Sequence, residues 1–272
     1  MENKNFWSIV KQFNILMKGA IEGPNCTDPS ICHGDCCSIK IDVPKILAQE
    51  YIRRGFAKRT DFIRSNVFSF HLRFDEKTGK CFLFEKTING CSVHHTGIKP
   101  PQCWIYPTNF SNPDENDIEC KRASGWRIID PNKARKAEKL LEEFIDLCKM
   151  EAKKSKKKIL KRLKHKKHKL IKKLQTFPPS ELGGVKDTWD HFEPLSAEGY
   201  SLQLKKFCKE KKKKCKYLED NDFLSCPAIC EIIAKEFVEF IKNHINEYIK
   251  LMGMSVDGHY PLIKFFEKIT LK

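Results

Sequence analysis

Cysteine is the residue type with the clearest chemical potential in this chain. Seven of its thirteen cysteines fall within residues 26–103, and they are Cys26, Cys32, Cys36, Cys37, Cys81, Cys91 and Cys103. Thiolate sulfur and imidazole nitrogen are the ligands that zinc and iron favour, and a tetrahedral ion needs about four of them. This stretch therefore predicts one or two ions or one polynuclear cluster, and its ligand types fit zinc, iron and an iron–sulfur cluster alike.

Two pairs of potential ligands are adjacent in the sequence, which limits how they can bind. On a strand, Cys36 and Cys37 would point to opposite faces, so both serve one ion only from a turn. The preceding residues supply such a turn, with Gly34 free to take a positive φ. His94 and His95 would likewise alternate if extended, so at most one faces the metal, and we take His95 as the candidate ligand.

A β hairpin is predicted to bring two of the cysteines together. Residues 67–74 and 81–86 are typical of strands, and an Asn-Gly pair at 89–90 is the strongest short hairpin signal. This geometry would place Cys81 and Cys91 on neighbouring strands, about 5 Å apart. His71 alternates with apolar neighbours in the first run, which predicts that it faces solvent.

The remaining elements are mostly helical. Asp42 is predicted to cap a helix that begins at Pro44, and a helix starting after Asp130 can run without a breaker to Gln175. The predicted fold class is α+β and helix-rich, with small antiparallel hairpins around the cysteine cluster, then a long basic helix and a helical C-terminal region. The predicted domains are a cysteine-cluster domain (1–148), a basic helical connector (149–176) and a helical C-terminal domain (177–272).

Composition favours a globular protein of the cytoplasm. Apolar residues make up 40% of the 272 residues, and no segment has the uninterrupted apolar length of a signal peptide or a membrane span. In a reducing compartment an odd number of cysteines is unlikely to form a disulfide framework, so metal ligation is the leading use of the clustered ones.

Positive charge is concentrated in two segments. Residues 149–173 carry fourteen Lys or Arg and one Glu, and residues 205–216 carry eight Lys and one Glu, against a net charge of +16 for the chain. The first segment should attract a polyanion such as RNA, a ribosome or anionic lipid. Its apolar stripe could pack on the C-terminal helices or on a membrane surface. Interleaved aromatic residues, which would indicate base stacking, are absent.

Three ordered motifs resemble a known family. The Cys-x-x-x-Cys-Cys step at 32–37, the CFLF run at 81–84 and the CSVHHTGIKPPQCWIYP segment at 91–107 are similar to the YkgJ-type cysteine-cluster family of zinc- or iron-chelating domains. The resemblance spans about residues 26–107. It implies a metal-binding set of Cys32, Cys36, Cys37, Cys81, Cys91 and Cys103, with Cys26. One departure is Lys99, which stands where Arg commonly precedes Pro100 in that family.

Other interpretations stay open. The same Cys-x-x-x-Cys-Cys step resembles flagellin lysine N-methylases, which suggests a cluster-dependent modifying enzyme, although no glycine-rich loop follows a strand. Cys103 with a histidine could instead form a nucleophile and base. A third hypothesis is an RNA- or ribosome-associated basic protein whose metal only stabilises the fold. A looser second set of cysteines, Cys208, Cys215, Cys226 and Cys230, could hold a further ion.

Overall fold

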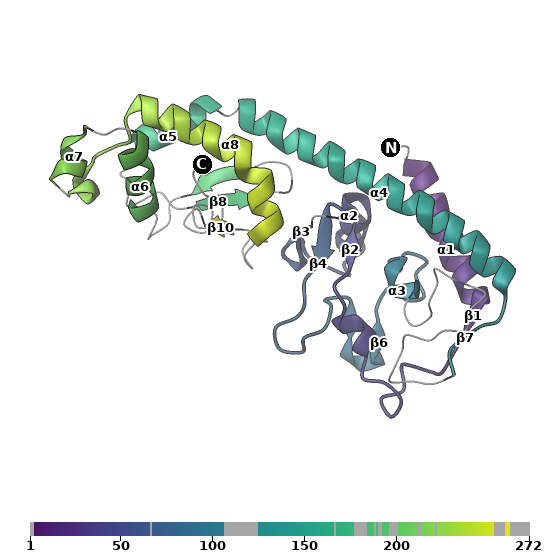
Figure 1. Ribbon diagram of the computed structural model, residues 1–272. Helices are drawn as coiled ribbons and strands as arrows, with labels where there is room; N and C mark the ends of the chain where they lie inside the picture. The colour runs from purple at the N-terminus through teal and green to yellow at the C-terminus, as the bar shows by residue number, and fades with distance from the viewer. Residues whose placement is uncertain are drawn as a thin grey trace. The chain divides into compact units, whose positions relative to one another are not determined.

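The computed structural model of the protein (Figure 1) describes residues 3–65, 67–105, 125–165, 167–176, 184–187, 189, 192–195, 201–211, 214–220, 222–252 and 259–261. It has the helix-rich α+β fold with small antiparallel sheets that the sequence predicts. The chain divides into two compact units, Met1–Lys153 and Lys154–Lys272, so the boundary falls within one long helix, α4 (Pro131–His165).

The first unit combines helices with very short strands. Its elements are α1 (Asn3–Ala20), β1 (Ile21–Glu22), η1 (Asp35–Ser38), β2 (Asp42–Val43), α2 (Lys45–Arg53), η2 (Arg59–Asp61), β3 (Phe62–Arg64), β4 (Phe70–Leu72), β5 (Phe84–Glu85), η3 (Lys86–Ile88), β6 (Gly90–Cys91), α3 (Gln102–Ile105) and β7 (Arg127–Ile128), followed by the first part of α4. The antiparallel sheets have the orders β1-β7, β2-β4-β3 and β5-β6.

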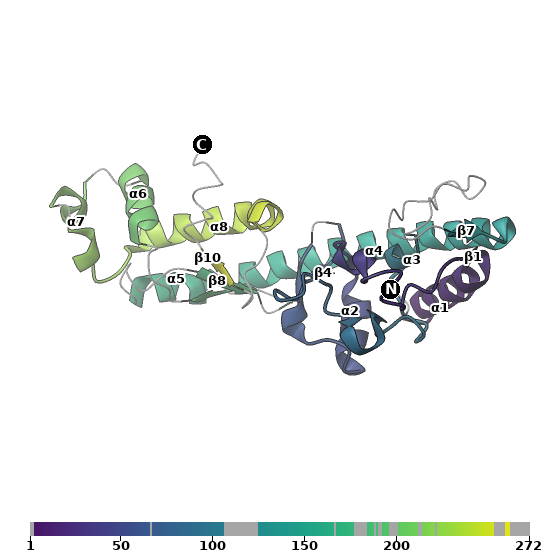
Figure 2. The ribbon, with the colours of Figure 1, turned by 90° about the horizontal axis from the view of Figure 1, so that it is seen from below.

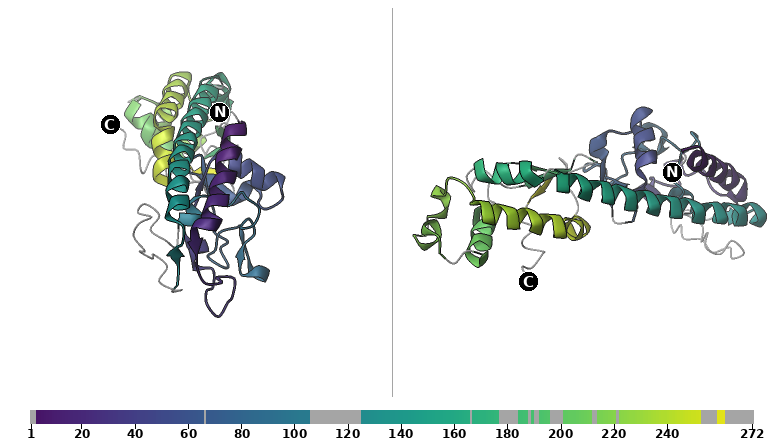
Figure 3. Two further views of the ribbon diagram at one scale, coloured as in Figure 1. Left: turned by 90° about the vertical axis from the view of Figure 1, so that its right-hand side faces the viewer. Right: turned by 90° about the horizontal axis from the view of Figure 1, so that it is seen from above.

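Helix α1 lies alongside the first part of α4, as Figures 2 and 3 show. Their contact is a compact apolar cluster in which Phe13, Met17 and Ala20 meet Ala134 and Ala137, all of them buried. Small residues on α4 let the two helices approach closely, and the apolar positions at helical spacing in α1 explain which face is covered. This packing gives the cysteine-bearing loops a rigid support.

The same part of α4 also holds helix α2 in place. The backbone N–H groups of Lys45 and Ile46, at the start of α2, donate to the Glu151 carboxylate, with an Ile46 N to Oε2 distance of 3.1 Å, and the Ser69 hydroxyl donates to it at 2.8 Å. The prediction that Asp42 caps this helix is wrong, because Asp42 accepts the hydroxyl of Ser65 instead. A carboxylate more distant in sequence satisfies the free N–H groups of α2.

Replacing Glu151 should therefore destabilise the first unit. In Glu151→Ala, two helix-terminal N–H groups and a serine hydroxyl lose a charged acceptor, which we expect to cost about 2 kcal/mol in the free energy of unfolding by urea. Glu142→Ala on the same helix, where the side chain is exposed, is the matched control and should change stability by less than about 0.5 kcal/mol. Equal stability of the two variants would contradict the capping role.

His71 is buried, so the prediction that it faces solvent is wrong. Its side chain is 7% exposed in β4, the central strand of its sheet, where it pairs with Asp42 on one side and Ile63 on the other. Alternation along a strand predicts exposure only when one face of the sheet is open, and here both faces of β4 are covered. The Nδ1 atom has no hydrogen-bond partner among the residues that the structure describes.

The burial of His71 should make stability depend on pH. Burial, and to a smaller extent the charge of Lys40, lowers the pKa of His71 to about 4. The unfolded chain, with a pKa of about 6.5 at this residue, binds more protons between those values, so stability falls as the pH falls through that window. Between pH 7 and pH 5, the metal-free protein should lose about 1–2 kcal/mol more than His71→Phe, measured by urea unfolding with a chelator present. Equal losses would show that His71 is not responsible.

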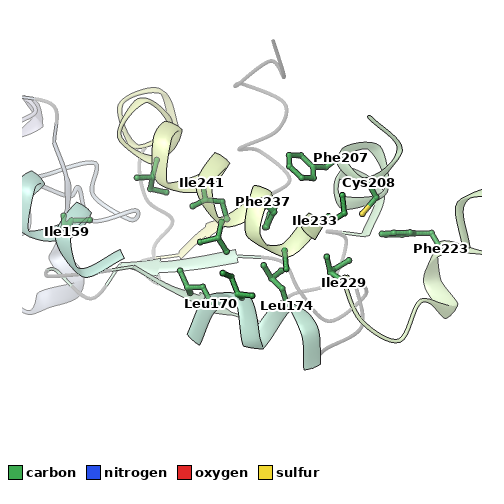
Figure 4. Packing of buried hydrophobic residues seen from close by; sticks show 14 residues of the cluster. Ile159, Leu170, Leu174, Phe207, Cys208, Phe223, Ile229, Ile233, Phe237 and Ile241 are labelled. Carbon is green, nitrogen blue, oxygen red and sulfur yellow. The ribbon is translucent and has the colours of Figure 1, made fainter. Parts of the chain in front are cut away.

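The second unit is built around one apolar core (Figure 4). Its elements after α4 are α5 (Lys167–Thr176), β8 (Gly184–Asp187), β9 (Phe192–Leu195), α6 (Ser201–Lys211), α7 (Lys216–Glu219), η5 (Phe223–Ser225), α8 (Glu231–Met252) and β10 (His259–Pro261). Leu170 and Leu174 of α5 point toward Ile233 and Phe237 of α8, and α6 contributes Phe207. The apolar stripe of the basic segment is thus used for packing on the C-terminal helices.

Two sequence predictions for the second unit need comment. The antiparallel sheet of order β10-β8-β9 was not predicted, since the C-terminal region was expected to be entirely helical. The predicted terminal helix over 261–271 lies outside the described residues, apart from its first position at the end of β10. Within the described ranges, no helix has both the length and the apolar character needed to cross a membrane.

Candidate metal centre

The adjacent cysteines lie in a tight turn, as their spacing requires. Gly34 has φ 69°, which confirms the expected positive φ, and the 3-10 turn η1 that carries Cys36 and Cys37 follows at once. A Cβ atom on Gly34 would approach the Phe84 ring to 2.4 Å. Glycine is therefore needed at this position for two reasons, its backbone conformation and its close contact with Phe84 of β5, the strand that pairs with the Cys91 strand β6.

The segment containing Cys81 and Cys91 approaches this turn. The Cys81 N–H donates to the Cys37 carbonyl at 2.7 Å, which joins the turn directly to the hairpin region. The predicted pairing of the two cysteines is wrong in register, because Cys81 forms an isolated bridge with Phe74 while Cys91 lies opposite Phe84. The strands predicted over 67–74 and 81–86 are much shorter than expected. The first is reduced to β4, of three residues, and the second to β5, of two.

Cys103 comes from a third segment, the short helix α3. Its backbone N–H donates to the Pro100 carbonyl at 3.0 Å, and its charge affects the ionisation of Tyr51 of α2. Tyr51 is fully buried and its hydroxyl donates to the Ile98 carbonyl at 2.7 Å. Burial, followed by the negative charges of Cys103, Cys91 and Cys81, raises the pKa of Tyr51.

The five thiols of these segments are close enough to alter one another's ionisation. A hydrogen bond from the Cys37 thiol lowers the pKa of Cys36 to about 6, and the pKa of Cys37 is raised in turn. Burial raises the pKa of Cys81 to about 12, and it also raises the pKa of Cys91 and Cys103, with neighbouring thiolate charges adding to the effect. Cys36 therefore loses its proton more readily than an ordinary cysteine. The other four thiols need a nearby cation to favour their thiolate forms.

Two of the buried sulfurs receive a backbone hydrogen bond. The N–H of Leu83 donates to Cys81 Sγ at 3.4 Å, and the N–H of Val93 donates to the Cys91 sulfur, in each case from two residues later. Each of these hydrogen bonds lowers the pKa of its cysteine and so opposes the effect of burial. Such bonds stabilise a thiolate, and hydrogen bonds to sulfur also tune the potential of iron–sulfur centres.

The other predicted ligands occupy different positions. Cys26 and Cys32 lie on the loop before η1, where the Cys32 carbonyl accepts the Asn89 side chain at 2.7 Å. His95 is exposed, and its ring packs edge-on against that of His94, with centroids 4.7 Å apart. The structure thus places the start of the 81–91 region beside the turn that carries Cys36 and Cys37, whereas Cys26 and Cys32 lie on the preceding loop and His95 is exposed.

A lysine that sequence motifs alone did not assign to the site favours the thiolate forms of Cys36, Cys91 and Cys103 through its positive charge. Lys99 is only 9% exposed, and its Nζ atom lies 3.1 Å from Nδ1 of His94 and 4.0 Å from the centroid of the Trp104 ring. Its backbone carbonyl accepts the side chain of Asn14 at 3.3 Å, and the Trp104 indole donates to Asn14 at 2.8 Å. Helix α1 therefore positions this corner of the site.

The donor chemistry fits a thiophilic metal, but the ligands are not preassembled. The twelve cysteines that the structure describes are free thiols. Among the described residues, no group of three or more Cys, His, Asp or Glu side chains is arranged to hold an ion. Binding would therefore require the thiols to draw together, as happens in proteins where metal binding is coupled to local folding.

The second set of cysteines is looser. Cys208 is buried in the apolar core of the second unit (Figure 4). Burial raises the pKa of Cys226, with the nearby charges of Cys215 and Cys230 adding to it. Cys215 directly precedes α7 and Cys230 directly precedes α8. Cys215 and Cys230 thus affect the ionisation of Cys226, while Cys208 is part of the apolar core.

Comparison with protein-family models, curated proteins and solved structures finds no match to this chain. The resemblance to the YkgJ-type family therefore stays a prediction from its motifs.

Proposed function

We propose that the first unit binds zinc or iron, the latter as an ion or in an iron–sulfur cluster, through its cysteine thiolates. The observation that carries the proposal is the contact between η1 and the 81–91 region, where the Cys81 N–H donates to the Cys37 carbonyl at 2.7 Å and backbone N–H groups donate to the sulfurs of Cys81 and Cys91. Cys36, Cys81, Cys91 and Cys103 would supply four ligands, with Cys37 as a fifth for a cluster.

The surroundings of the thiols support this proposal over a set of buried structural cysteines. A cysteine that only fills space needs no hydrogen bond to its sulfur. Here Cys81 and Cys91 accept backbone N–H groups, and the thiol of Cys36 has its pKa lowered to about 6. Thiolates are the form that binds metal, so these features favour metal ligation.

Elemental analysis of protein purified without oxygen tests the proposal and separates its alternatives. A zinc protein should be colourless and an iron–sulfur protein brown, with acid-labile sulfide in proportion to iron. The matched control is a variant in which Cys36 and Cys103 are both replaced by serine. Metal content is measured in the purified proteins and again after reconstitution with zinc or with iron and sulfide. If the wild type holds no more metal than this control in both measurements, the proposal is refuted.

A second candidate function is binding of single-stranded RNA by the basic helices of the second unit. Among the side chains that the structure describes, seven lysines of α4 and α5 in this unit are exposed, and they are Lys154, Lys157, Lys158, Lys161, Lys164, Lys169 and Lys172. Lys167 differs because Glu239 pairs with it at 2.6 Å. A row of exposed cations of one sign attracts phosphates through counterion release.

The packing of the same helices favours RNA over a membrane as the partner. The apolar stripe predicted for this segment comprises Ile159, Leu160, Leu163, Leu170 and Leu174. Ile159, Leu170 and Leu174 are buried in the core of the second unit, Leu160 packs against it, and the side chain of Leu163 lies outside the described ones. A surface helix binds lipid by inserting such a stripe, and the described side chains of these helices in the second unit include no exposed large apolar residue. Titration of a fluorescent RNA oligonucleotide, with anionic vesicles in parallel, tests this choice. Binding to vesicles alone would refute it.

A further inference from the structure

Helices α1 and α4 leave a groove on the surface of the first unit, where they lie side by side (Figure 3). The groove has a volume of about 400 Å³ and a mostly apolar lining. Each helix contributes three side chains at helical spacing, and they are Gln12, Ile15 and Leu16 on α1 and Lys136, Lys139 and Leu140 on α4. Because Leu16 and Leu140 also pack against the buried cluster that joins the two helices, the groove extends the apolar core to the surface.

Ile15 is the part of this groove that folding leaves uncovered. Its side chain is 60% exposed, the highest value for a large apolar residue among the described residues of the first unit. A single exposed apolar side chain is ordinary on a protein surface. Ile15, however, shares one hollow with Leu16 and Leu140. Covering this hollow with another apolar surface would therefore release hydrophobic free energy that folding alone does not gain.

Lysines border the groove on both sides. Two of them line its α4 wall, and two more lie four residues before and three residues after Ile15 on α1, which places them beside it. All four are exposed and, among the residues that the structure describes, have no carboxylate partner, and they are Lys11, Lys18, Lys136 and Lys139. Lys133, one turn before Lys136, differs because Asp130 pairs with it at 3.1 Å. The apolar hollow thus has an uncompensated positive rim.

The shape and charge of the groove fit one kind of occupant, a helix. Two packed helices with side chains at i, i+3 and i+4 form the ridges between which a third helix lies. A pocket for a small molecule buries most of its ligand, whereas Ile15 is open to solvent over more than half of its surface. A nucleic acid would use the lysines but gain nothing from the apolar floor.

We propose that this groove is the docking site for an acidic amphipathic helix of a partner protein. Apolar side chains at i, i+3 or i+4 and i+7 of that helix would cover Ile15, Leu16 and Leu140. Its aspartates or glutamates on either side of the apolar stripe would pair with the lysines of the rim, which sets the choice of partner and its orientation. The inference is independent of metal and RNA binding, because it uses neither the cysteine-bearing segments nor the second unit.

A synthetic peptide tests the apolar part of the proposal. The probe is a fluorescein-labelled helical peptide with leucines at i, i+3, i+4 and i+7 and glutamates on both sides, titrated with the full chain and followed by fluorescence anisotropy. Ile15→Glu should weaken its binding at least about tenfold. Ile88→Glu, at an exposed apolar residue elsewhere in the first unit, is the matched control and should bind as wild type does.

Exchanging charges tests the rim. The double variant Lys136→Glu, Lys139→Glu should bind the glutamate peptide at least about tenfold more weakly than wild type and should bind a lysine-flanked version of the peptide more tightly than wild type does. The double variant Lys77→Glu, Lys86→Glu has the same net charge, with both exposed lysines outside the groove, and should behave as wild type. Urea unfolding should be the same for all these variants, since every substituted side chain is exposed.

Each outcome decides for or against the docking site. Loss of binding in Ile15→Glu, with reversal of charge preference in the α4 variant alone, supports it. Failure of wild type to bind the peptide would overturn it. So would equal binding of a peptide with the same composition but scattered leucines, because general attraction to lysines would then account for the signal. A wild-type dimer in sedimentation that Ile15→Glu dissociates would place a second copy of the chain in the groove and would also overturn the proposal.

Discussion

Cys36→Ser and Cys103→Ser should each lose most of the bound zinc or iron and unfold at a lower urea concentration than wild type. A serine hydroxyl does not replace a thiolate as a ligand for these metals, and the free energy of metal binding contributes directly to folding of a site that is not preassembled. We expect a loss of several kcal/mol in the presence of metal. Added chelator should bring the stability of wild type close to that of both variants.

Cys148→Ala is the matched control for these variants. Its thiol is fully buried on α4, and burial, with the charge of Glu151 adding to it, raises its pKa. This cysteine is therefore an apolar core residue, and its removal should cost about 1 kcal/mol with metal content unchanged. Metal content that stays at the wild-type level in both Cys36→Ser and Cys103→Ser would show that the thiols identified here are not the ligands.

The sequence was most informative where local chemistry decides the structure. Gly34 before two adjacent cysteines predicts a turn with a positive φ, and the structure has one. The long helix after Asp130 follows from an uninterrupted helical pattern, and the structure has α4 and α5 in this segment, with residue 166 between them outside the described residues. In these cases the determinants lie within a few residues of the feature they determine.

Features set by tertiary contacts were missed for a physical reason. The cap of α2 is Glu151, which lies 106 residues after Lys45, and no local pattern announces such a pairing. Hairpin register depends on which side chains meet across strands of two residues, so Phe84 rather than Cys81 faces Cys91. Tyr51 lies near Cys103 only because α2 packs there, which no local pattern predicts. Lys99 could have been found from the sequence, because it stands immediately before a Pro-Pro step and a cysteine.

The basic face of the second unit should give RNA binding a steep dependence on salt. In the variant with Lys157, Lys158, Lys161 and Lys164 all replaced by glutamine, four exposed cations are removed from one helix. Each phosphate contact on single-stranded RNA contributes about 0.7 to the slope of log K against log salt concentration, so the slope should become less steep by about 3. At low salt, affinity should fall by at least about tenfold.

The control for this RNA-binding experiment is a variant that loses four positive charges from the first unit instead of the second. Replacing the exposed Lys4, Lys11, Lys77 and Lys86 of the first unit by glutamine gives a protein of identical net charge with the helix face intact. Net charge alone would weaken RNA binding equally in both variants, whereas a defined surface predicts that the control keeps the wild-type slope. Metal content should be the same in wild type and in the helix variant, because its four lysines belong to the second unit and the proposed metal ligands to the first. Parallel slopes for the two variants would refute the RNA-binding surface.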